Sequence, residues 1–335
     1  MIALKKKDFI SDQHIRWCPG CGDYSILSQV QTVMASLGRE QHEFAVISGI
    51  GCSSRLPYYV NTYGFHTIHG RAPAVAAGLK IANPELSVWQ ITGDGDALSI
   101  GGNHLIHALR RNLDIQILLF NNRIYGLTKG QYSPTSEPGK KTKSTPMGSI
   151  DHPIEPCALA LGADATFVAR AVDIFVKHQR KVLTEAYHHK GTSFIELFQN
   201  CNIFNDGAFA HITNKKTKED AVVYCNHGEP LTFGKKGEPV KGLHLNKSLK
   251  LEVLTIGENG ITEDDILVHD ETNMILATML VRLKPPFPVA MGVIYRVERA
   301  CYEDVIHQQI KEAKSKPNSG DISKLLYSKN TWVVD

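Results

Sequence analysis

The sequence predicts an α/β protein built on a doubly wound parallel sheet, with a C-terminal extension. Two observations support this prediction. Short apolar runs typical of buried strands alternate with helical patterns through about residue 200, and several of these runs end at turns rich in Gly, Asp or Asn. The 335 residues are 42% hydrophobic and 21% charged, which excludes a disordered chain, a coiled coil and a collagen.

The expected elements follow from hydrophobic periodicity and from the Gly-containing turns that end them. Strands are expected at residues 44–50, 86–92, 115–120, 166–169 and 193–197. Helices are expected at residues 24–37, 72–82, 102–111, 156–161 and 174–188. Residues 129–150 interrupt the pattern with a long loop rich in Lys, Ser, Thr, Pro and Gly, which we expect to be a lid or a solvated segment.

Charge and hydropathy exclude several classes of function. The net charge of +3 is too small for a dedicated nucleic-acid binder, and the longest apolar runs are too short to span a bilayer. Lysines 5–7 are followed by no apolar segment of a secretory signal. We therefore expect a cytoplasmic protein that binds neither nucleic acid nor membranes.

Seven cysteines without a secretion signal argue against a disulfide scaffold. Cys18 and Cys21 form a Cys-Pro-Gly-Cys turn, and Cys52 lies in a second Gly-rich turn. Two thiolates of a Cys-x-x-Cys turn can reach one metal ion or cluster. With Cys201 farther along the chain, the spacing suits a [4Fe–4S] cluster. A structural zinc, a reactive dithiol and plain core cysteines remain alternatives.

The sharpest motif is Gly-Asp-Gly-Asp at residues 93–96, followed by Asn-Asn at 121–122. The motif places Asp94 and Asn122 at the carboxyl ends of two predicted strands, where open α/β sheets bind ligands. Their side-chain oxygens, with the backbone carbonyl of Ile124, suit Mg²⁺ bound to a diphosphate. This arrangement resembles the thiamine diphosphate fingerprint; the alternative is an ordinary acidic turn.

Together, these motifs resemble the β subunits of the 2-oxoacid:ferredoxin oxidoreductases. The resemblance covers residues 17 to about 205 and rests on five strings. They are Trp-Cys-Pro-Gly-Cys-Gly at 17–22, Gly-Ile-Gly-Cys-Ser at 49–53, His-Thr-Ile-His-Gly-Arg at 66–71, Gly-Asp-Gly-Asp at 93–96 and Asn-Asn-Arg-Ile-Tyr-Gly-Leu-Thr-Lys-Gly-Gln at 121–131. Beyond residue 205 the resemblance is looser, and no chemistry is transferred there.

The resemblance implies thiamine diphosphate, Mg²⁺ and one [4Fe–4S] cluster as cofactors. The implied cluster ligands are Cys18, Cys21, Cys52 and Cys201, and the implied Mg²⁺ ligands are Asp94, Asn122 and the carbonyl of Ile124. The implied thiamine diphosphate contacts are Ile50, Gly51, Cys52, Ser53, His69, Gly95, Asp96, Gly126 and Leu127. Cys52 thus belongs to both sets, which brings a one-electron acceptor close to the thiamine.

Five further side chains need an interpretation. Arg55, three residues after Cys52, could bind a substrate carboxylate or form a structural ion pair, and we predict a catalytic role for it. His66 stays open between a site residue and a polar turn residue. Cys157, Cys225 and Cys301 are expected to be core thiols.

The resemblance also implies a separate α subunit in an αβ or (αβ)₂ assembly, because the carboxylate that activates thiamine comes from another domain in this family. The expected division is residues 1–205 for cofactor binding and 206–335 for an extension that packs on the core or on the partner.

The predicted reaction is CoA-dependent oxidative decarboxylation of 2-oxoglutarate to succinyl-CoA and CO₂, or its reverse, with ferredoxin as the electron carrier. The alternatives are pyruvate as the substrate, a non-redox thiamine enzyme without iron, and a zinc-stabilised binding module without catalysis.

Overall fold

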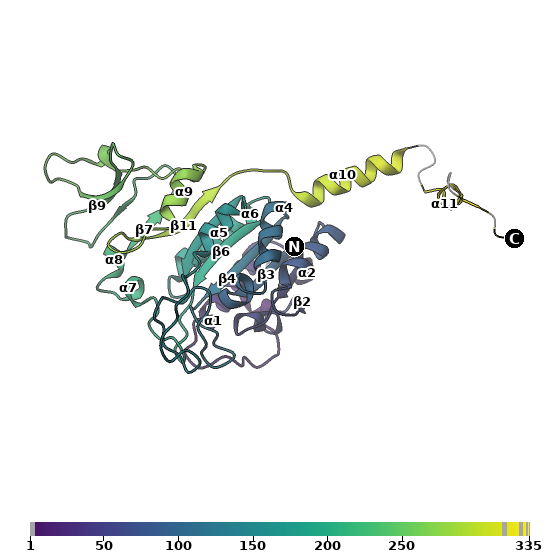
Figure 1. The fold of residues 1–335 in the computed structure, drawn as a ribbon, viewed down its shortest axis with the longest axis horizontal. Helices are drawn as coiled ribbons and strands as arrows, with labels where there is room; N and C mark the ends of the chain where they lie inside the picture. Colours follow the sequence, from purple (N-terminus) through teal and green to yellow (C-terminus); the bar gives the residue numbers. More distant parts are fainter. Residues whose placement is uncertain (1–3, 317–319, 328–330, 333, 335) are drawn as a thin grey trace.

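The computed structural model describes residues 4–316, 320–327, 331–332 and 334. In this part of the chain, one sheet contains eight strands in the order β2-β1-β3-β4-β6-β5-β11-β7 (Figure 1). All neighbouring strands are parallel except β11 and β5, which are antiparallel. The predicted α/β class with a mostly parallel sheet is therefore confirmed. The strands are β1 (Phe44–Ser48), β2 (Tyr63–His66), β3 (Ser87–Gly93), β4 (Ile115–Asn121), β5 (Phe167–Val172), β6 (Ser193–Phe198), β7 (Val222–Cys225) and β11 (Val289–Arg296).

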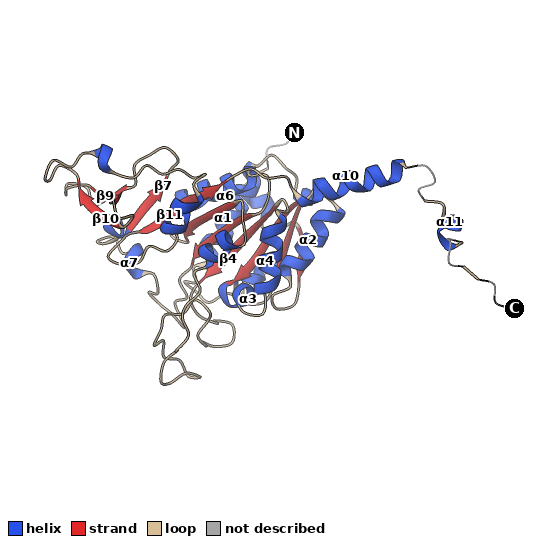
Figure 2. Cartoon of the chain, turned by 45° about the horizontal axis from the view of Figure 1, so that its top comes forward, coloured by secondary structure: helices blue, strands red, loops and turns tan. Residues whose placement is uncertain are grey.

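Helices cover both faces of this sheet, which explains why the central strands lack an alternating pattern (Figure 2). Strands β1, β4, β5 and β6 are buried at every position. One face packs against α2 (Ala72–Ala82), α4 (Gly102–Arg111) and α5 (Pro156–Gly162), and the other against α1 (Asp23–Ser36) and α6 (Val176–His188). Each face of the sheet thus carries a large hydrophobic core, and a smaller cluster of described residues forms around Phe198, Phe209 and Met291.

The strands and helices predicted up to residue 200 are present, with ends that differ by a few residues. Two elements escaped the sequence reading. The strand β2 is exposed along its whole length and therefore carries no hydrophobic signal. The helix α3 (Asp94–Leu98) is one short turn that begins inside the Gly-Asp-Gly-Asp motif.

The chain beyond residue 205 is partly built into the main sheet, because β11 and β7 form its far edge. The division at residue 205 stays a prediction about which part of the chain binds the cofactors. The main sheet itself continues beyond this residue to Arg296. A small antiparallel sheet stands beyond this edge, in the order β10-β9-β8. Its strands are β8 (Thr232–Phe233), β9 (Lys241–Leu245) and β10 (Leu251–Thr255).

Short helices connect these strands, and one long helix leaves the body. The helix α10 (Tyr302–Ser315) projects away from the sheet and leads to α11 (Ile322–Leu326) (Figure 1). The remaining helices are α7 (Ala210–Thr213), α8 (Lys218–Ala221) and α9 (Met274–Leu280). The 3₁₀ turns are Lys6–Phe9, Gln41–Glu43, Ser53–Tyr58 and Glu263–Asp265. No helix in the described ranges is long and apolar enough to cross a membrane.

Strand register brings the sequence motifs together. Ser48 at the end of β1 pairs with Ile91, Gly93 at the end of β3 pairs with Phe120, and Asn121 at the end of β4 pairs with Phe198. All four strands run in the same direction, so the segments that follow them leave from one edge of the sheet. The turns that begin at residues 49, 94, 122 and 199 therefore meet at the carboxyl edge, where α/β sheets bind ligands.

The free energy of unfolding is predicted to depend on pH, because the fold buries His189. Burial lowers the pKa of His189 to about 4, with a smaller contribution from Arg296 and an opposing one from Asp114. The unfolded chain, with an ordinary histidine pKa near 6.5, then binds more protons than the folded chain below that pH. The stability associated with neutral His189 is present above pH 6.5 and is lost as the pH falls toward 4.

We expect His189→Gln to weaken this dependence by about 1–2 kcal/mol between pH 7.5 and pH 5. Urea unfolding of both proteins at the two pH values measures it. The exposed His42→Gln provides the matched control and should follow the wild type. An equal loss of stability on acidification in wild type and His189→Gln contradicts the prediction.

Candidate active site

A cleft opens at the carboxyl edge of the sheet, between the turn after β1, the start of α3 and the segment after β4. Every residue predicted from the sequence to contact thiamine diphosphate lines this cleft, as do Asp94, Asn122 and Ile124. The cleft also contains residues that the sequence reading did not single out as contacts: Gly93, Phe120, Tyr125 and Thr128. Larger hollows occur elsewhere on the described surface, but only this cleft gathers the motif residues.

The carboxylate of Asp96 ties the walls of the cleft together. Its Oδ1 accepts hydrogen bonds from the backbone N–H groups of Ile50 (3.1 Å) and Gly70 (2.8 Å) and lies 2.7 Å from His69 Nδ1. Its Oδ2 accepts a hydrogen bond from the Thr92 hydroxyl at 2.8 Å. Asp96 is 3% exposed, so these bonds replace water. Asp96 therefore positions three segments of the cleft wall.

Two positions in this arrangement require glycine, because side chains of other residues lie too close to their Cα atoms for a Cβ atom to fit. A Cβ atom at Gly49 would lie 1.8 Å from Asp96 Oδ2, and a Cβ at Gly95 would lie 2.1 Å from the Tyr125 ring. The Tyr125 hydroxyl also donates to the Gly95 carbonyl at 3.1 Å. Any larger residue would thus push the cleft walls apart, which explains the glycines of these motifs in physical terms.

Asp94 is equally buried but is held differently. Its Oδ2 accepts hydrogen bonds from the hydroxyls of Ser133 and Thr135, each at 2.5 Å, and the side chain is 2% exposed. Burial raises the pKa of Asp94 to about 6, while the two hydroxyls oppose that shift. Both hydroxyls come from the loop at 129–150, which the sequence reading treated only as a lid or solvated segment.

The two asparagines after β4 have different roles. Asn122 Oδ1 accepts from the backbone N–H of Ile124 at 3.1 Å, which turns the chain at the cleft. Asn121 instead points into the protein, where its Nδ2 donates to Glu196 Oε1 at 2.8 Å. Glu196 forms a buried ion pair with Arg170, with 2.7 Å between Oε2 and Nε. Through Glu196, this ion pair holds the side chain of Asn121 at the end of β4.

The donor atoms beside Asp94 fit a hard cation. A buried carboxylate whose pKa is raised is stabilised by a positive charge nearby. Asp94, Asn122 and the carbonyl of Ile124 offer only oxygen, and a diphosphate would complete the oxygen shell that Mg²⁺ requires. The residues present therefore fit a diphosphate-bound magnesium ion.

The four cysteines named from the sequence lie around the same turn. A Cβ atom at Gly126 would lie 3.6 Å from the sulfur atoms of both Cys52 and Cys201. Burial, together with smaller contributions from Asp23, Cys201 and Cys18, raises the pKa of Cys52 to about 12. Burial likewise raises the pKa of Cys21, with contributions from Asp23, Cys52 and Cys201. The four thiols are thus close enough to interact electrostatically.

Their spacing bears on the kind of metal group that they could bind. In the part of the chain that the structure describes, no three His, Cys, Asp or Glu side chains are placed to hold a metal ion. A [4Fe–4S] cluster distributes its four thiolates over four iron atoms, so its ligands stand farther apart than those of one ion. The arrangement of these cysteines is therefore compatible with a cluster.

Arg55 lies outside the cleft lining. Its Nε donates to the Tyr59 hydroxyl at 3.0 Å, and its guanidinium stands 5.8 Å from the centre of the Tyr58 ring. It is half-buried, and its charge lowers the pKa of Cys52. Arg55 thus contacts Tyr58 and Tyr59 and acts on Cys52 through its charge, and its contact with substrate stays a prediction.

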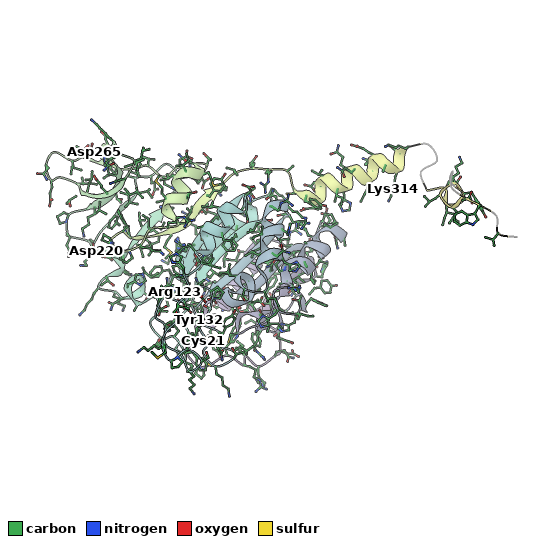
Figure 3. All side chains as sticks on the ribbon, viewed as in Figure 1. Cys21, Arg123, Tyr132, Asp220, Asp265 and Lys314 are labelled. Atoms are coloured by element: carbon green, nitrogen blue, oxygen red, sulfur yellow. The ribbon has the colours of Figure 1, made fainter. Side chains whose placement is uncertain are left out.

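The other singled-out residues have structural partners. His66 Nδ1 lies 2.9 Å from the Ser48 hydroxyl and 3.0 Å from the Ser54 carbonyl oxygen, which is the turn role. Cys157, Cys225 and Cys301 are buried free thiols, as expected for core cysteines. Figure 3 labels Cys21, Arg123 and Tyr132 at the end of the molecule that carries the long loops.

Known proteins are similar to this chain in sequence and in fold. Residues 49–197 match the family described as "Thiamine pyrophosphate enzyme, C-terminal TPP binding domain". The 2-oxoglutarate oxidoreductase subunit KorB of Mycobacterium tuberculosis is 51% identical over 99% of this chain and 89% of its own length. The β subunit of 2-oxoacid:ferredoxin oxidoreductase 1 from Aeropyrum pernix is 48% identical over 57% of this chain and 60% of its own.

A solved structure agrees with these relatives over nearly the whole chain. The 2-oxoglutarate:ferredoxin oxidoreductase from Magnetococcus marinus, with 2-oxoglutarate, coenzyme A and succinyl-CoA bound, has a TM-score of 0.78 and 33% identity. The match covers 98% of this chain and 97% of that one.

Fold, cleft and family match define a thiamine-diphosphate-binding subunit of an oxidoreductase. More narrowly, the chain belongs to the β subunits of the 2-oxoacid:ferredoxin oxidoreductases, and the resemblance read from the sequence is confirmed. A β subunit implies an α-subunit partner.

The role of Asp96 predicts the effect of its amide. Asp96→Asn keeps the shape of the side chain but replaces one carboxylate oxygen with an NH₂ group. This group cannot accept the hydrogen bonds that the oxygen accepts in the wild type. We expect a loss of about 2–4 kcal/mol in the free energy of unfolding, because at least one buried donor loses its acceptor. Urea unfolding without added cofactor measures it. The exposed Asp264→Asn is the matched control, and a loss below about 0.5 kcal/mol for Asp96→Asn would count against the role of Asp96.

Proposed function

We propose that this chain is the β subunit of a 2-oxoglutarate:ferredoxin oxidoreductase. With its α subunit it converts 2-oxoglutarate and CoA to succinyl-CoA and CO₂, and two electrons pass one at a time to ferredoxin; the reverse is reductive carboxylation. The observation that carries the proposal is the position of Cys52, which both lines the cleft and belongs to the four-cysteine group. The substrate is proposed from the names of KorB of Mycobacterium tuberculosis and of the Magnetococcus marinus enzyme.

Each part of the cleft has a task in this reaction. Thiamine diphosphate, when bound, supplies the carbanion chemistry of decarboxylation. Asp94, Asn122 and the Ile124 carbonyl would hold Mg²⁺ on its diphosphate. The turn at 49–53 and residues 126–127 would enclose the cofactor, while Asp96 keeps these walls in place through Ile50 and His69.

The cysteine group supplies the electron path. Cys18, Cys21, Cys52 and Cys201 would bind one [4Fe–4S] cluster, which accepts one electron at a time. Cys52 both lines the cleft and belongs to the cysteine group, so a cluster held there would lie beside a cofactor bound in the cleft. Removal of electrons one at a time requires such a neighbouring one-electron acceptor.

The remaining partners follow from the same reaction. CoA accepts the acyl group, ferredoxin accepts the electrons, and the α subunit completes the thiamine site in an αβ or (αβ)₂ assembly. All seven cysteines are free thiols, which suits the reducing cytoplasm. The strands β7 and β11 join the chain beyond residue 205 to the main sheet, and we propose that α10 and α11 reach the partner subunit. Pyruvate is the second candidate substrate.

One purification tests the proposal. The chain is expressed with its α subunit and purified without oxygen, and iron, acid-labile sulfide and thiamine diphosphate are measured per αβ pair. We expect about four irons and one thiamine diphosphate from this chain, and CoA-dependent dye reduction faster with 2-oxoglutarate than with pyruvate. Thiamine diphosphate without iron would indicate a non-redox thiamine enzyme, and zinc without thiamine would overturn the proposal.

Cysteine variants localise the iron. We expect Cys201→Ser to lose most of the iron, because one of four ligands is missing, while thiamine diphosphate remains bound through the Asp94 side of the cleft. The buried Cys301→Ser is the matched control and should keep its iron. Equal iron content in the two variants would remove Cys201 from the ligand set.

Arg55 has its own test. If its guanidinium binds the substrate carboxylate, Arg55→Gln raises the KM for 2-oxoglutarate by about 10-fold or more, since a charge-assisted contact of about 1.5–3 kcal/mol is lost. Arg55→Lys should restore part of the affinity, because it keeps the charge. Arg71→Gln is the comparison, because it removes another guanidinium beside the cleft wall, where Arg71 donates to the His69 carbonyl. An unchanged KM with lowered stability in Arg55→Gln would indicate a purely structural residue.

A further inference from the structure

The cysteine group reaches the protein surface at one point. Cys18 is exposed, as are Pro19 and Gly20 beside it, whereas Cys21, Cys52 and Cys201 are half-buried. Cys18 is thus the most exposed of the four cysteines. An acceptor that binds at residues 18–20 would approach a cluster held by these cysteines from its most exposed side.

Apolar side chains lie beside this exposed turn. Asn202 Nδ2 donates to the Pro19 carbonyl at 2.7 Å, so the segment after Cys201 packs directly against residues 18–20. The next two side chains, Ile203 and Phe204, are 55% and 37% exposed. Two exposed apolar side chains therefore follow directly after the residue that packs on the exposed turn.

The loop at 129–150 borders the same place. A Cβ atom at Gly130 would lie 3.0 Å from the Phe204 ring, and Lys140 Nζ donates a hydrogen bond to Asn205 Oδ1. Ser133 and Thr135 anchor the loop on Asp94, as described above. The loop therefore meets the segment after Cys201 at Gly130 and at Lys140, and Lys141 and Lys143 follow the second of these contacts in the chain.

This loop concentrates the positive charge of the chain. Its lysines at 129, 140, 141 and 143 and its single acid, Glu137, give a net charge of +3, which equals that of all 335 residues. The other residues contain 33 basic and 33 acidic side chains and are neutral in sum. Lys140 is paired with Glu137, whereas Lys129, Lys141 and Lys143 are exposed.

We propose that this surface docks the electron carrier. The carrier face consists of residues 18–20, Ile203, Phe204, Lys129, Lys141 and Lys143. It fits a small one-electron carrier protein with an acidic surface and a redox centre near that surface. The inference rests on the proposed function, since it assigns the place where the electrons of that reaction leave the protein.

The composition of the carrier face suits such a partner. Positive charge around a small apolar centre speeds encounters with an acidic protein by 10- to 1,000-fold and loses its effect as salt rises. Two exposed apolar side chains are enough for a brief contact but not for a permanent one, and redox encounters are typically small and weak. Fast arrival and fast release are what a carrier that turns over repeatedly requires.

Charge reversal of the loop tests the inference in the intact αβ complex. The variant Lys141→Glu/Lys143→Glu is compared with the wild type, with 2-oxoglutarate and CoA as substrates. The acceptor is either a bacterial ferredoxin that the wild type reduces or an uncharged benzoquinone. At low ionic strength we expect kcat/KM for ferredoxin to fall about 10-fold or more, and the difference to shrink near 0.5 M salt. The rate with benzoquinone should stay within about twofold of the wild type.

A matched variant controls for net charge. Lys236→Glu/Lys247→Glu makes the same change on exposed lysines of the small β8–β10 sheet, at the other side of the molecule from α10 (Figure 1). It should reduce ferredoxin at the wild-type rate. Equal loss in both variants would mean that overall charge, rather than the carrier face, governs the reaction, and would overturn the inference.

Two further outcomes separate the possible failures. Loss of the α subunit from Lys141→Glu/Lys143→Glu on gel filtration would assign the loop to the subunit interface and overturn the docking role. A wild-type complex that reduces neither acceptor with 2-oxoglutarate would refute the proposed function itself. Wild-type activity with both acceptors and an unchanged ferredoxin kcat/KM in the variant would refute only the carrier face.

Discussion

The cleft depends on one buried carboxylate. Asp96 accepts hydrogen bonds from the turn after β1, from the segment before α2 and from β3 itself, so a single side chain fixes the distances among three walls. Its cost of burial is offset because both oxygens are occupied by donors, two of them backbone N–H groups. The small residues around it, such as Gly49, follow from the space that the carboxylate occupies.

The two acids of the Gly-Asp-Gly-Asp motif illustrate how environment separates identical side chains. Asp96 is surrounded by structural donors, and its task is to hold the backbone. Asp94, two residues earlier, is buried with two hydroxyls from a distant loop, and burial raises its pKa to about 6. An acid in that condition is stabilised by a cation, which is the property expected of a ligand for a diphosphate-bound metal.

The loop at 129–150 links the inside of the cleft to the outside of the protein. Ser133 and Thr135 fasten one part of it to Asp94, and Gly130 and Lys140 fasten other parts to the segment after Cys201. A loop of this length would otherwise be costly to order. These contacts join one segment both to a buried acid of the cleft and to the segment that follows Cys201.

The sequence by itself determined the mostly parallel sheet and the approximate ends of its central strands, because these features depend on local hydrophobic runs and on turns with special residues. The residues that gather in the cleft were implied by the family resemblance of the motifs, and all of them line it. It could not assign Asp96 to the walls, Ser133 and Thr135 to Asp94, or Glu196 to Asn121, since each of these contacts joins segments whose distance only the folded chain fixes. Nor could it place β7 and β11 in the main sheet: their neighbours come from far along the chain, and strand order depends on tertiary packing rather than on any local pattern.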